Sequence, residues 1–210
     1  MHNLGPTREI LDIKIDRDRF KCSLTISQQQ YCIDMLNCFT MADCRPVTTP
    51  MDPGSVLSDA QQPESDVDKA FMCSVNYGAT IGSLQYLSCT TCPDIAYYVD
   101  QLASFTTNPG IARWTAVKHL FHYIKGTINY GIRYSPDTST SQPFLTFSDT
   151  NHGGYKDSGH STGTYIIKIG TGAVFWSSKC QSIVILSTTE AEYIAACKAG
   201  KEIIWMHQLL

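Results

Sequence analysis

Apolar and charged positions alternate near the start of the chain, where Leu11, Ile13 and Ile15 are separated by Asp12, Lys14 and Asp16. This period of two predicts a half-buried strand over residues 10–16. A polar turn at 17–19 leads into a second alternating run, so the two runs are predicted to form a β-hairpin. Ser27 and Gln30 then have the spacing of a capping box, and apolar residues at helical spacing predict a helix that ends near residue 41.

The middle of the chain is predicted to be a polar linker followed by a small helical module. Residues 45–69 are rich in Pro, Thr, Ser, Asp and Gln, which is typical of a linker. Beyond it, helical patterns and their start signals predict helices over residues 71–90, 93–106 and 111–125. A short strand at 130–134 and a polar loop at 135–143 are predicted to end this module.

The last third of the chain changes to short strands followed by one long helix. Strands are predicted over residues 144–149, 163–169, 173–177 and 181–186, with a Gly-rich turn at 152–160. The helix is predicted over residues 188–210, with an apolar stripe of Tyr193, Ala196, Cys197, Gly200, Ile203 and Ile204. A second apolar set, Ile194, Trp205 and Leu209, falls on the far side, so we expect this helix to be covered on two faces.

This order of elements predicts an α+β chain in four parts. They are a β-hairpin with a helix in residues 1–50, a linker in 51–70, a helical connection in 71–140, and a strand-rich domain with a long helix in 141–210. With 43% hydrophobic residues, the chain is long enough to bury a substantial core.

Composition narrows the classes of function. The 210 residues carry a formal charge of −3, so the chain offers no broad basic field, and any contact with a nucleic-acid backbone is expected to be local. Nine cysteines without a repeating spacing indicate reduced thiols rather than a disulfide framework. There is neither an apolar run of membrane-spanning length nor a secretory signal, and the expected compartment is intracellular, either cytoplasmic or nuclear.

The start of the long helix contains the strongest candidate for chemistry. Ser187 and Glu190 have the spacing of a capping box, which predicts a structural role for both and leaves Glu192 free. Asp149 is predicted at the end of a strand in the same segment. Two such carboxylates can hold Mg²⁺ together, although an Asp or Glu at the end of an element more often only caps it or faces solvent.

A zinc site is the main alternative on composition. Cys89-x-x-Cys92 and His119-x-x-His122 have tolerable spacing within each pair, but 26 residues separate the pairs. The histidines also fall in a predicted helix whose apolar face must be filled. Small buried thiols and satisfied histidines are therefore the favoured interpretation.

Two further patterns are considered and set aside. Tyr98-Val99-Asp100-Gln101 lacks the second aspartate of a polymerase motif and falls in a predicted helix rather than in a hairpin. The basic residues Arg113, Lys118 and Lys125 could contact a phosphate backbone, but a solvated helix face is favoured. Neither a hydrolase nucleophile elbow nor a phosphate-binding loop is present.

Short motifs spread along the chain carry a family resemblance. They include Leu4-Gly5-Pro6, Leu24-Thr25-Ile26-Ser27-Gln28, Cys44 through Asp52, Gly82 through Leu87, Pro93 through Tyr97, Tyr123 through Thr127, Phe147-Ser148-Asp149, Ser161-Thr162-Gly163 and Leu186 through Tyr193. In this order they resemble the carboxy-terminal part of the Pol polyprotein of copia-type LTR retrotransposons. The resemblance runs from the tail of the reverse transcriptase through the connection to the start of the ribonuclease H domain.

The resemblance implies a partial ribonuclease H-like mixed sheet with one long carboxy-terminal helix. It also implies two-metal cleavage of the RNA strand of an RNA–DNA hybrid, with Mg²⁺ or Mn²⁺ bridged by carboxylates. Asp149 matches the aspartate of the family's first strand, and Glu192 matches the glutamate of its first helix. The expected partners are the hybrid and the remaining upstream and downstream segments of Pol.

Some positions depart from the family pattern. Asn151-His152 stands where the family commonly has Asp-Trp, and His160 stands where it has a basic residue before Ser-Thr. The family's other two catalytic carboxylates lie on a later strand and helix, whereas this sequence stops at Leu210. We therefore expect little or no nuclease activity from this chain alone. The alternative is a non-catalytic, domesticated or decaying fragment that acts as a nucleic-acid or protein interaction module.

Overall fold

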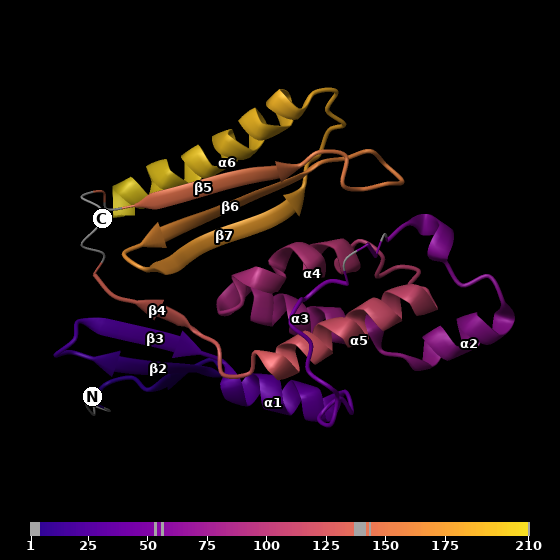
Figure 1. Cartoon of the computed structure of the whole chain (residues 1–210), viewed down its shortest axis with the longest axis horizontal. Helices are drawn as coiled ribbons and strands as arrows, with labels where there is room; N and C mark the ends of the chain where they lie inside the picture. Colours follow the sequence, from indigo (N-terminus) through magenta and orange to yellow (C-terminus); the bar gives the residue numbers. More distant parts are fainter. Residues whose placement is uncertain (1–4, 53, 56, 137–141, 143, 210) are drawn as a thin grey trace.

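The computed structural model describes residues 5–52, 54, 55, 57–136, 142 and 144–209. It is an α+β chain with two antiparallel sheets, a group of packed helices and a long carboxy-terminal helix (Figure 1). Leu4 of the first motif, the predicted boundary between residues 140 and 141, and the predicted helix end at Leu210 lie outside the described residues. No helix in the described ranges is long and apolar enough to cross a membrane.

The first sheet joins the start of the chain to the segment that follows the helices. Its antiparallel strands are β1 (Glu9–Ile10), β2 (Ile13–Asp18), β3 (Ser23–Ser27) and β4 (Ile132–Tyr134), in that order across the sheet. The β2–β3 hairpin confirms the alternating pattern, but its turn lies at residues 19–22 rather than 17–19. The prediction for Leu11 is wrong because this residue occupies a turn with φ of 49° and is 78% exposed.

Five helices follow the hairpin, namely α1 (Gln29–Cys38), α2 (Asp66–Ser74), α3 (Tyr77–Thr90), α4 (Ala96–Ala103) and α5 (Ile111–Gly126). Short 3-10 turns, η1 (Asp59–Gln61) and η2 (Pro93–Ile95), precede α2 and α4. The predicted cap at Ser27 is wrong, since Ser27 lies in β3 and α1 is preceded by Gln28. The single helix predicted over residues 71–90 is also wrong, because the chain starts a new helix where the Asn76 side chain accepts the N–H of Ala79 at 3.3 Å.

One hydrophobic core holds these helices together. Its fully buried centre includes Leu84, Leu87, Leu102, Val117, Leu120 and Phe121, and α1 contributes the buried residues Cys32, Met35 and Leu36 to the same cluster. The helix of the first predicted part and the helices of the third part therefore share one core. The linker between them packs against this core through the partly buried Val47, Met51 and Leu57.

The second sheet consists of β5 (Leu145–Asn151), β6 (Thr162–Ile169) and β7 (Gly172–Cys180), paired antiparallel in that order. The predicted strand over residues 181–186 is wrong, because β7 itself continues to Cys180 and the chain then leaves the sheet. Strand β5 continues two residues past Asp149, so this aspartate lies within the strand rather than at its end. Together with α6 (Thr188–Leu209), this sheet forms a partial ribonuclease H-like unit.

Helix α6 lies on one face of the second sheet, against β5 and β6 (Figure 1). Its buried stripe is Ala191, Ala195, Ala199 and Met206. The predicted stripe is wrong, since Tyr193 is 71% and Ile204 is 63% exposed. The physical reason is close packing: a Cβ on Gly163 of β6 would lie 3.5 Å from the Cβ of Ala195, a separation that only small side chains permit.

Candidate metal site and its surroundings

Asp149 lies on β5, paired with Thr164 of β6, and its side chain is exposed. Its neighbour Thr150 faces α6, because the Thr150 hydroxyl donates a hydrogen bond of 3.2 Å to the carbonyl oxygen of Ala191. Successive side chains of a strand point to opposite faces of the sheet. The Asp149 carboxylate therefore leaves β5 on the face opposite to α6.

Glu192 lies near the start of α6, directly after the buried Ala191, and it is exposed. The start of the helix is capped by Ser187, whose hydroxyl accepts the N–H of Glu190 at 3.2 Å. The Glu190 side chain is exposed as well. Because Ala191 faces the sheet, the next residue is rotated about 100° around the helix and stands at the side of the strand–helix contact.

The two candidate carboxylates are thus brought to one region of the structure. Asp149 and Glu192 are each one residue away from the hydrogen bond that joins Thr150 to Ala191. The Asp149 side chain leaves β5 on the face away from α6, and Glu192 follows the residue of α6 that faces the sheet. Within the described ranges, no group of three or more His, Cys, Asp or Glu side chains is placed to hold a metal ion.

The face of the second sheet opposite to α6 looks toward the helical core. Asn151, which shares its strand face with Asp149, donates from its side-chain amide to the Tyr97 hydroxyl of α4 at 2.8 Å. Trp176 of β7 donates its indole N–H to the carbonyl oxygen of Ser88 at 2.7 Å. A cleft of about 640 Å³ opens beside this contact, between β7 and helices α3 and α4.

A half-buried carboxylate joins the same two layers. Asp100 of α4 accepts a hydrogen bond of 3.0 Å from the Tyr155 hydroxyl in the loop after β5. Burial raises the pKa of Asp100, while the hydrogen bond from Tyr155 and a second one from the Cys180 amide oppose the rise. Burial and the neighbouring Asp100 in turn raise the pKa of Tyr155. In the sequence, Asp100 stands out only as part of the rejected polymerase motif, since nothing local indicates its distant partners.

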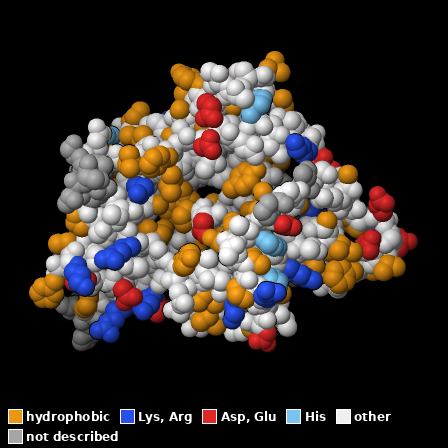
Figure 2. All heavy atoms as spheres, viewed as in Figure 1, with side chains coloured by type: hydrophobic (Ala, Val, Ile, Leu, Met, Phe, Trp, Pro, Cys, Tyr) orange, Lys and Arg blue, Asp and Glu red, His pale blue; other side chains and the backbone are white. Residues whose placement is uncertain are grey.

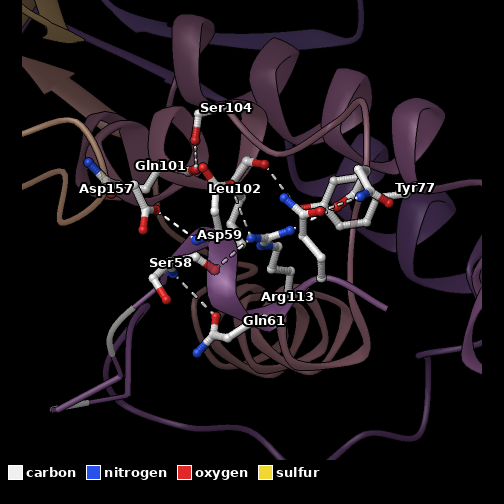
Figure 3. A network of polar contacts seen from close by, with 11 residues as sticks. Ser58, Asp59, Gln61, Tyr77, Gln101, Leu102, Ser104, Arg113 and Asp157 are labelled. Carbon is white, nitrogen blue, oxygen red and sulfur yellow. Dashed lines mark hydrogen bonds and ion pairs between the residues drawn. The ribbon is translucent and has the colours of Figure 1, made fainter. Parts of the chain in front are cut away.

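Arg113 contradicts the expected solvated basic face of α5, because only 1% of its surface is exposed. Figure 3 shows it within a network of polar contacts. Its guanidinium donates to the carbonyl oxygens of Asn108 at 2.8 Å and Ser58 at 2.6 Å, and it lies 3.9 Å from the ring centroid of Phe105. Burial lowers the pKa of Arg113, and Asp59, 3.6 Å away, opposes this shift.

Arg113 holds the linker against the helical core, and η1 in the same linker also contacts the loop after β5 of the second sheet. The backbone N–H of Asp59 donates to a carboxylate oxygen of Asp157 at 2.7 Å (Figure 3). A signal for this role was present in the sequence. Arg113 falls in the first turn of α5, where the helix dipole disfavours a cation, so the arginine needed a specific partner.

The zinc candidates have other partners. His119 lies 3.0 Å from the carbonyl oxygen of Thr49 through Nε2, and His122 lies 2.7 Å from that of Arg45 through Nδ1. Both histidines thereby bind the linker to α5. Burial raises the pKa of the Cys92 thiol to about 12, which opposes formation of the thiolate that zinc requires.

Basic side chains gather elsewhere on the molecule. Figure 2 shows them over the first sheet, where Lys14, Arg17, Arg19 and Lys21 are exposed on or beside the β2–β3 hairpin. Acidic neighbours partly neutralise this group, since Lys14 pairs with Asp16 at 3.1 Å. This basic group lies on the first sheet, whereas Asp149 and Glu192 belong to the second sheet and its helix.

Comparison with known proteins identifies relatives along the whole chain. The chain is 38% identical to the retrovirus-related Pol polyprotein from transposon TNT 1-94 of Nicotiana tabacum, over 100% of this chain and 16% of that protein. It is 35% identical to the Pol polyprotein from transposon RE1 of Arabidopsis thaliana, over 93% of this chain and 13% of that protein. A secreted RxLR effector protein 161 of Plasmopara viticola is 34% identical over 64% of this chain and 94% of its own length.

No protein-family model and no solved structure matches the chain. The chain spans about a sixth or less of the length of the two Pol polyproteins. These identities over nearly the whole chain show that the chain belongs to the retrovirus-related Pol polyproteins of copia-type transposons.

Proposed function

We propose that this chain is a segment of a retrotransposon Pol polyprotein whose residues 145–209 contribute two carboxylates, Asp149 and Glu192, to a ribonuclease H-like site. The observation that carries this proposal is their position beside the Thr150–Ala191 contact, on the first strand and near the start of the helix that covers it. Membership of the Pol family supports it. In the whole polyprotein, the site would cleave the RNA strand of an RNA–DNA hybrid with the help of Mg²⁺.

The described residues alone do not fit a bound ion. Mg²⁺ requires near-octahedral coordination by oxygen atoms, and two metals require carboxylates that bridge them. No third carboxylate in the described ranges joins Asp149 and Glu192. Their proposed role is therefore to contribute to a site that needs further oxygen ligands.

A cleavage assay tests the catalytic side of this proposal. We expect the chain to cleave a labelled RNA–DNA hybrid in Mg²⁺ no faster than its Asp149→Asn and Glu192→Gln variants do. Cleavage above that background, lost in both variants, would show that the two carboxylates act without further ligands and would overturn the incomplete-site interpretation.

Paramagnetic broadening tests the assignment of the two residues independently of cleavage. Mn²⁺ replaces Mg²⁺ on oxygen ligands and broadens NMR signals near it. Two carboxylates without further ligands hold such an ion only weakly, so we expect millimolar Mn²⁺ to be needed to broaden the amide signals around Asp149 and Glu192, and Asp149→Asn to reduce this effect. Asp16→Asn, which changes an exposed strand aspartate on the other sheet, is the matched control. Broadening that is equal in the two variants would contradict the assignment.

A non-catalytic function is the second candidate, and one observation favours it. The RxLR effector relative consists almost wholly of the matching segment, since the alignment covers 94% of its length. A segment of this kind therefore occurs as most of a short protein. Under this alternative, the chain is a nucleic-acid or protein interaction module, and its binding to a hybrid is expected to be unaffected by Glu192→Gln and by removal of Mg²⁺.

A further inference from the structure

A buried glutamine stands directly after β7, where the chain leaves the second sheet. Gln181 is only 1% exposed, and its backbone N–H donates to the carbonyl oxygen of Ser161 at 2.8 Å. Its side-chain amide donates to the carbonyl oxygen of Ala191 in α6 at 3.1 Å. Long polar side chains are seldom fully buried without a specific partner. The burial of Gln181 is therefore tied to its contact with the start of α6.

The Ala191 carbonyl oxygen accepts from two side chains of the sheet region. Besides Gln181, the Thr150 hydroxyl of β5 donates to it at 3.2 Å. A carbonyl within a helix ordinarily accepts from the N–H four residues later, so two side-chain donors at one such carbonyl are unusual. This carbonyl belongs to the peptide bond between Ala191 and Glu192, and Thr150 directly follows Asp149. The two donors thus hold the backbone of Glu192 close to the backbone of Asp149.

The neighbouring strand leaves space for the Gln181 amide. A Cβ on Gly163 of β6 would lie 3.2 Å from the amide nitrogen of Gln181, which is closer than an ordinary van der Waals contact. The side-chain oxygen of Gln181 is also buried and has no hydrogen-bond partner among the described residues. Such an acceptor lowers stability, so an apolar side chain would serve packing better. The amide donor is therefore the part of Gln181 that explains its presence.

We propose that Gln181 is a positioning residue that holds the Ala191–Glu192 peptide, and with it the Glu192 carboxylate, at a fixed place beside Asp149. Hydrogen bonds that orient the residues next to a metal increase the affinity of the site. Gln181 contacts the backbone of α6 and is not itself a metal ligand. The inference rests on the proposed function, since the place of Glu192 matters for chemistry only if Glu192 contributes to a metal site.

Amide hydrogen exchange without metal tests whether Gln181 holds the start of α6. Gln181→Met keeps the unbranched shape of the side chain and removes the donor, so exchange at Glu192 should become about fivefold faster, the effect of losing one hydrogen bond. Thr150→Val removes the other donor and should also speed exchange there. Gln101→Met is the matched control, because it makes the same change at another buried glutamine, on α4, and should leave exchange at Glu192 unchanged.

A titration with Mn²⁺, followed by NMR broadening, separates positioning from stability. We expect the two methionine variants to have similar midpoints of unfolding in urea. Gln181→Met should nevertheless need roughly two to five times as much Mn²⁺ as the unmodified chain for the same broadening at Glu192. Gln101→Met should match the unmodified chain in this titration.

The outcomes distinguish the positioning role from the metal role. Equal Mn²⁺ dependence in Gln181→Met and the unmodified chain would overturn the positioning role, and a lowered urea midpoint alone would then assign Gln181 to stability. Unchanged exchange at Glu192 in both Gln181→Met and Thr150→Val would overturn it as well. If the unmodified chain shows no broadening at Glu192, the metal role has failed and the inference falls with it; faster exchange in Gln181→Met would then show that this residue only holds the helix.

Discussion

Replacing Arg113 by methionine removes a buried guanidinium that binds the linker to the helical core. Methionine keeps the unbranched shape of the side chain and fills much of the same space. The substitution leaves the carbonyl oxygens of Ser58 and Asn108 without their donor, and it removes the contact with the ring of Phe105. The ion pair with Asp59 contributes little, because Asp59 is 61% exposed.

The expected loss follows from these contacts. Each hydrogen bond from a charged donor is worth about 1.5–3 kcal/mol, and a desolvated cation–π contact is worth up to about 2 kcal/mol. Because methionine is uncharged, the variant does not bury a charge, and this offsets the loss by several kcal/mol. The net decrease in the free energy of unfolding is therefore expected to be roughly 2–4 kcal/mol.

Denaturation in urea measures this loss, with Lys201→Met as the control for removal of one exposed positive charge on a helix. Limited proteolysis gives a local readout, because release of the linker should expose Leu57 to thermolysin before the core unfolds. An Arg113→Met variant that matches Lys201→Met in both measurements would refute the anchoring role.

Three other predictions concern the contacts between the second sheet and the helices. Trp176→Phe removes the indole hydrogen bond to α3 and should cost roughly 1 kcal/mol in thermal denaturation, whereas Trp205→Phe, at a half-exposed tryptophan, should cost less. Gly154→Ala places a Cβ 2.7 Å from the side-chain nitrogen of Asn151 and should weaken the hydrogen bond from Asn151 to Tyr97 by roughly 1 kcal/mol. Gly82→Ala, the control, has open space within a helix and should be neutral or stabilising. Burial raises the folded-state pKa of Asp100, so the folded chain holds that proton more tightly than the unfolded chain does. The free energy of unfolding should therefore fall as the pH rises from about 4 through the raised pKa. Asp100→Asn should flatten this fall, and a steeper fall in the variant would contradict the reasoning.

Local patterns were sufficient to predict much of the secondary structure. The β2–β3 hairpin, α5 and α6 follow from alternation and helical spacing, because those periods depend only on neighbours along the chain. The errors fall where two local signals compete. Ser27 has a capping spacing yet lies in a strand, since pairing with Lys14 outweighs the cap. The break at Asn76 was hidden because the apolar residues on both of its sides continue a helical pattern.

For the candidate site, the sequence indicates which carboxylates to consider, but it does not give the directions of their side chains. The motifs around Asp149 and Glu192 indicate the family, and full-chain relatives confirm it. The direction of the Asp149 side chain depends on which face of β5 meets α6, and a strand has two faces. Thr150 occupies the α6 face, so Asp149 takes the other one.

By itself, the sequence determined the hairpin, the long helices, the α+β class and the family. Tertiary structure alone decided that β4 joins β3 across more than a hundred residues, that Ala191 rather than Tyr193 faces the sheet, and that Arg113 is buried. The physical reason is the range of the interactions. Periodicity and capping act within a few residues, whereas burial and the partners of a polar group depend on segments that meet only after folding.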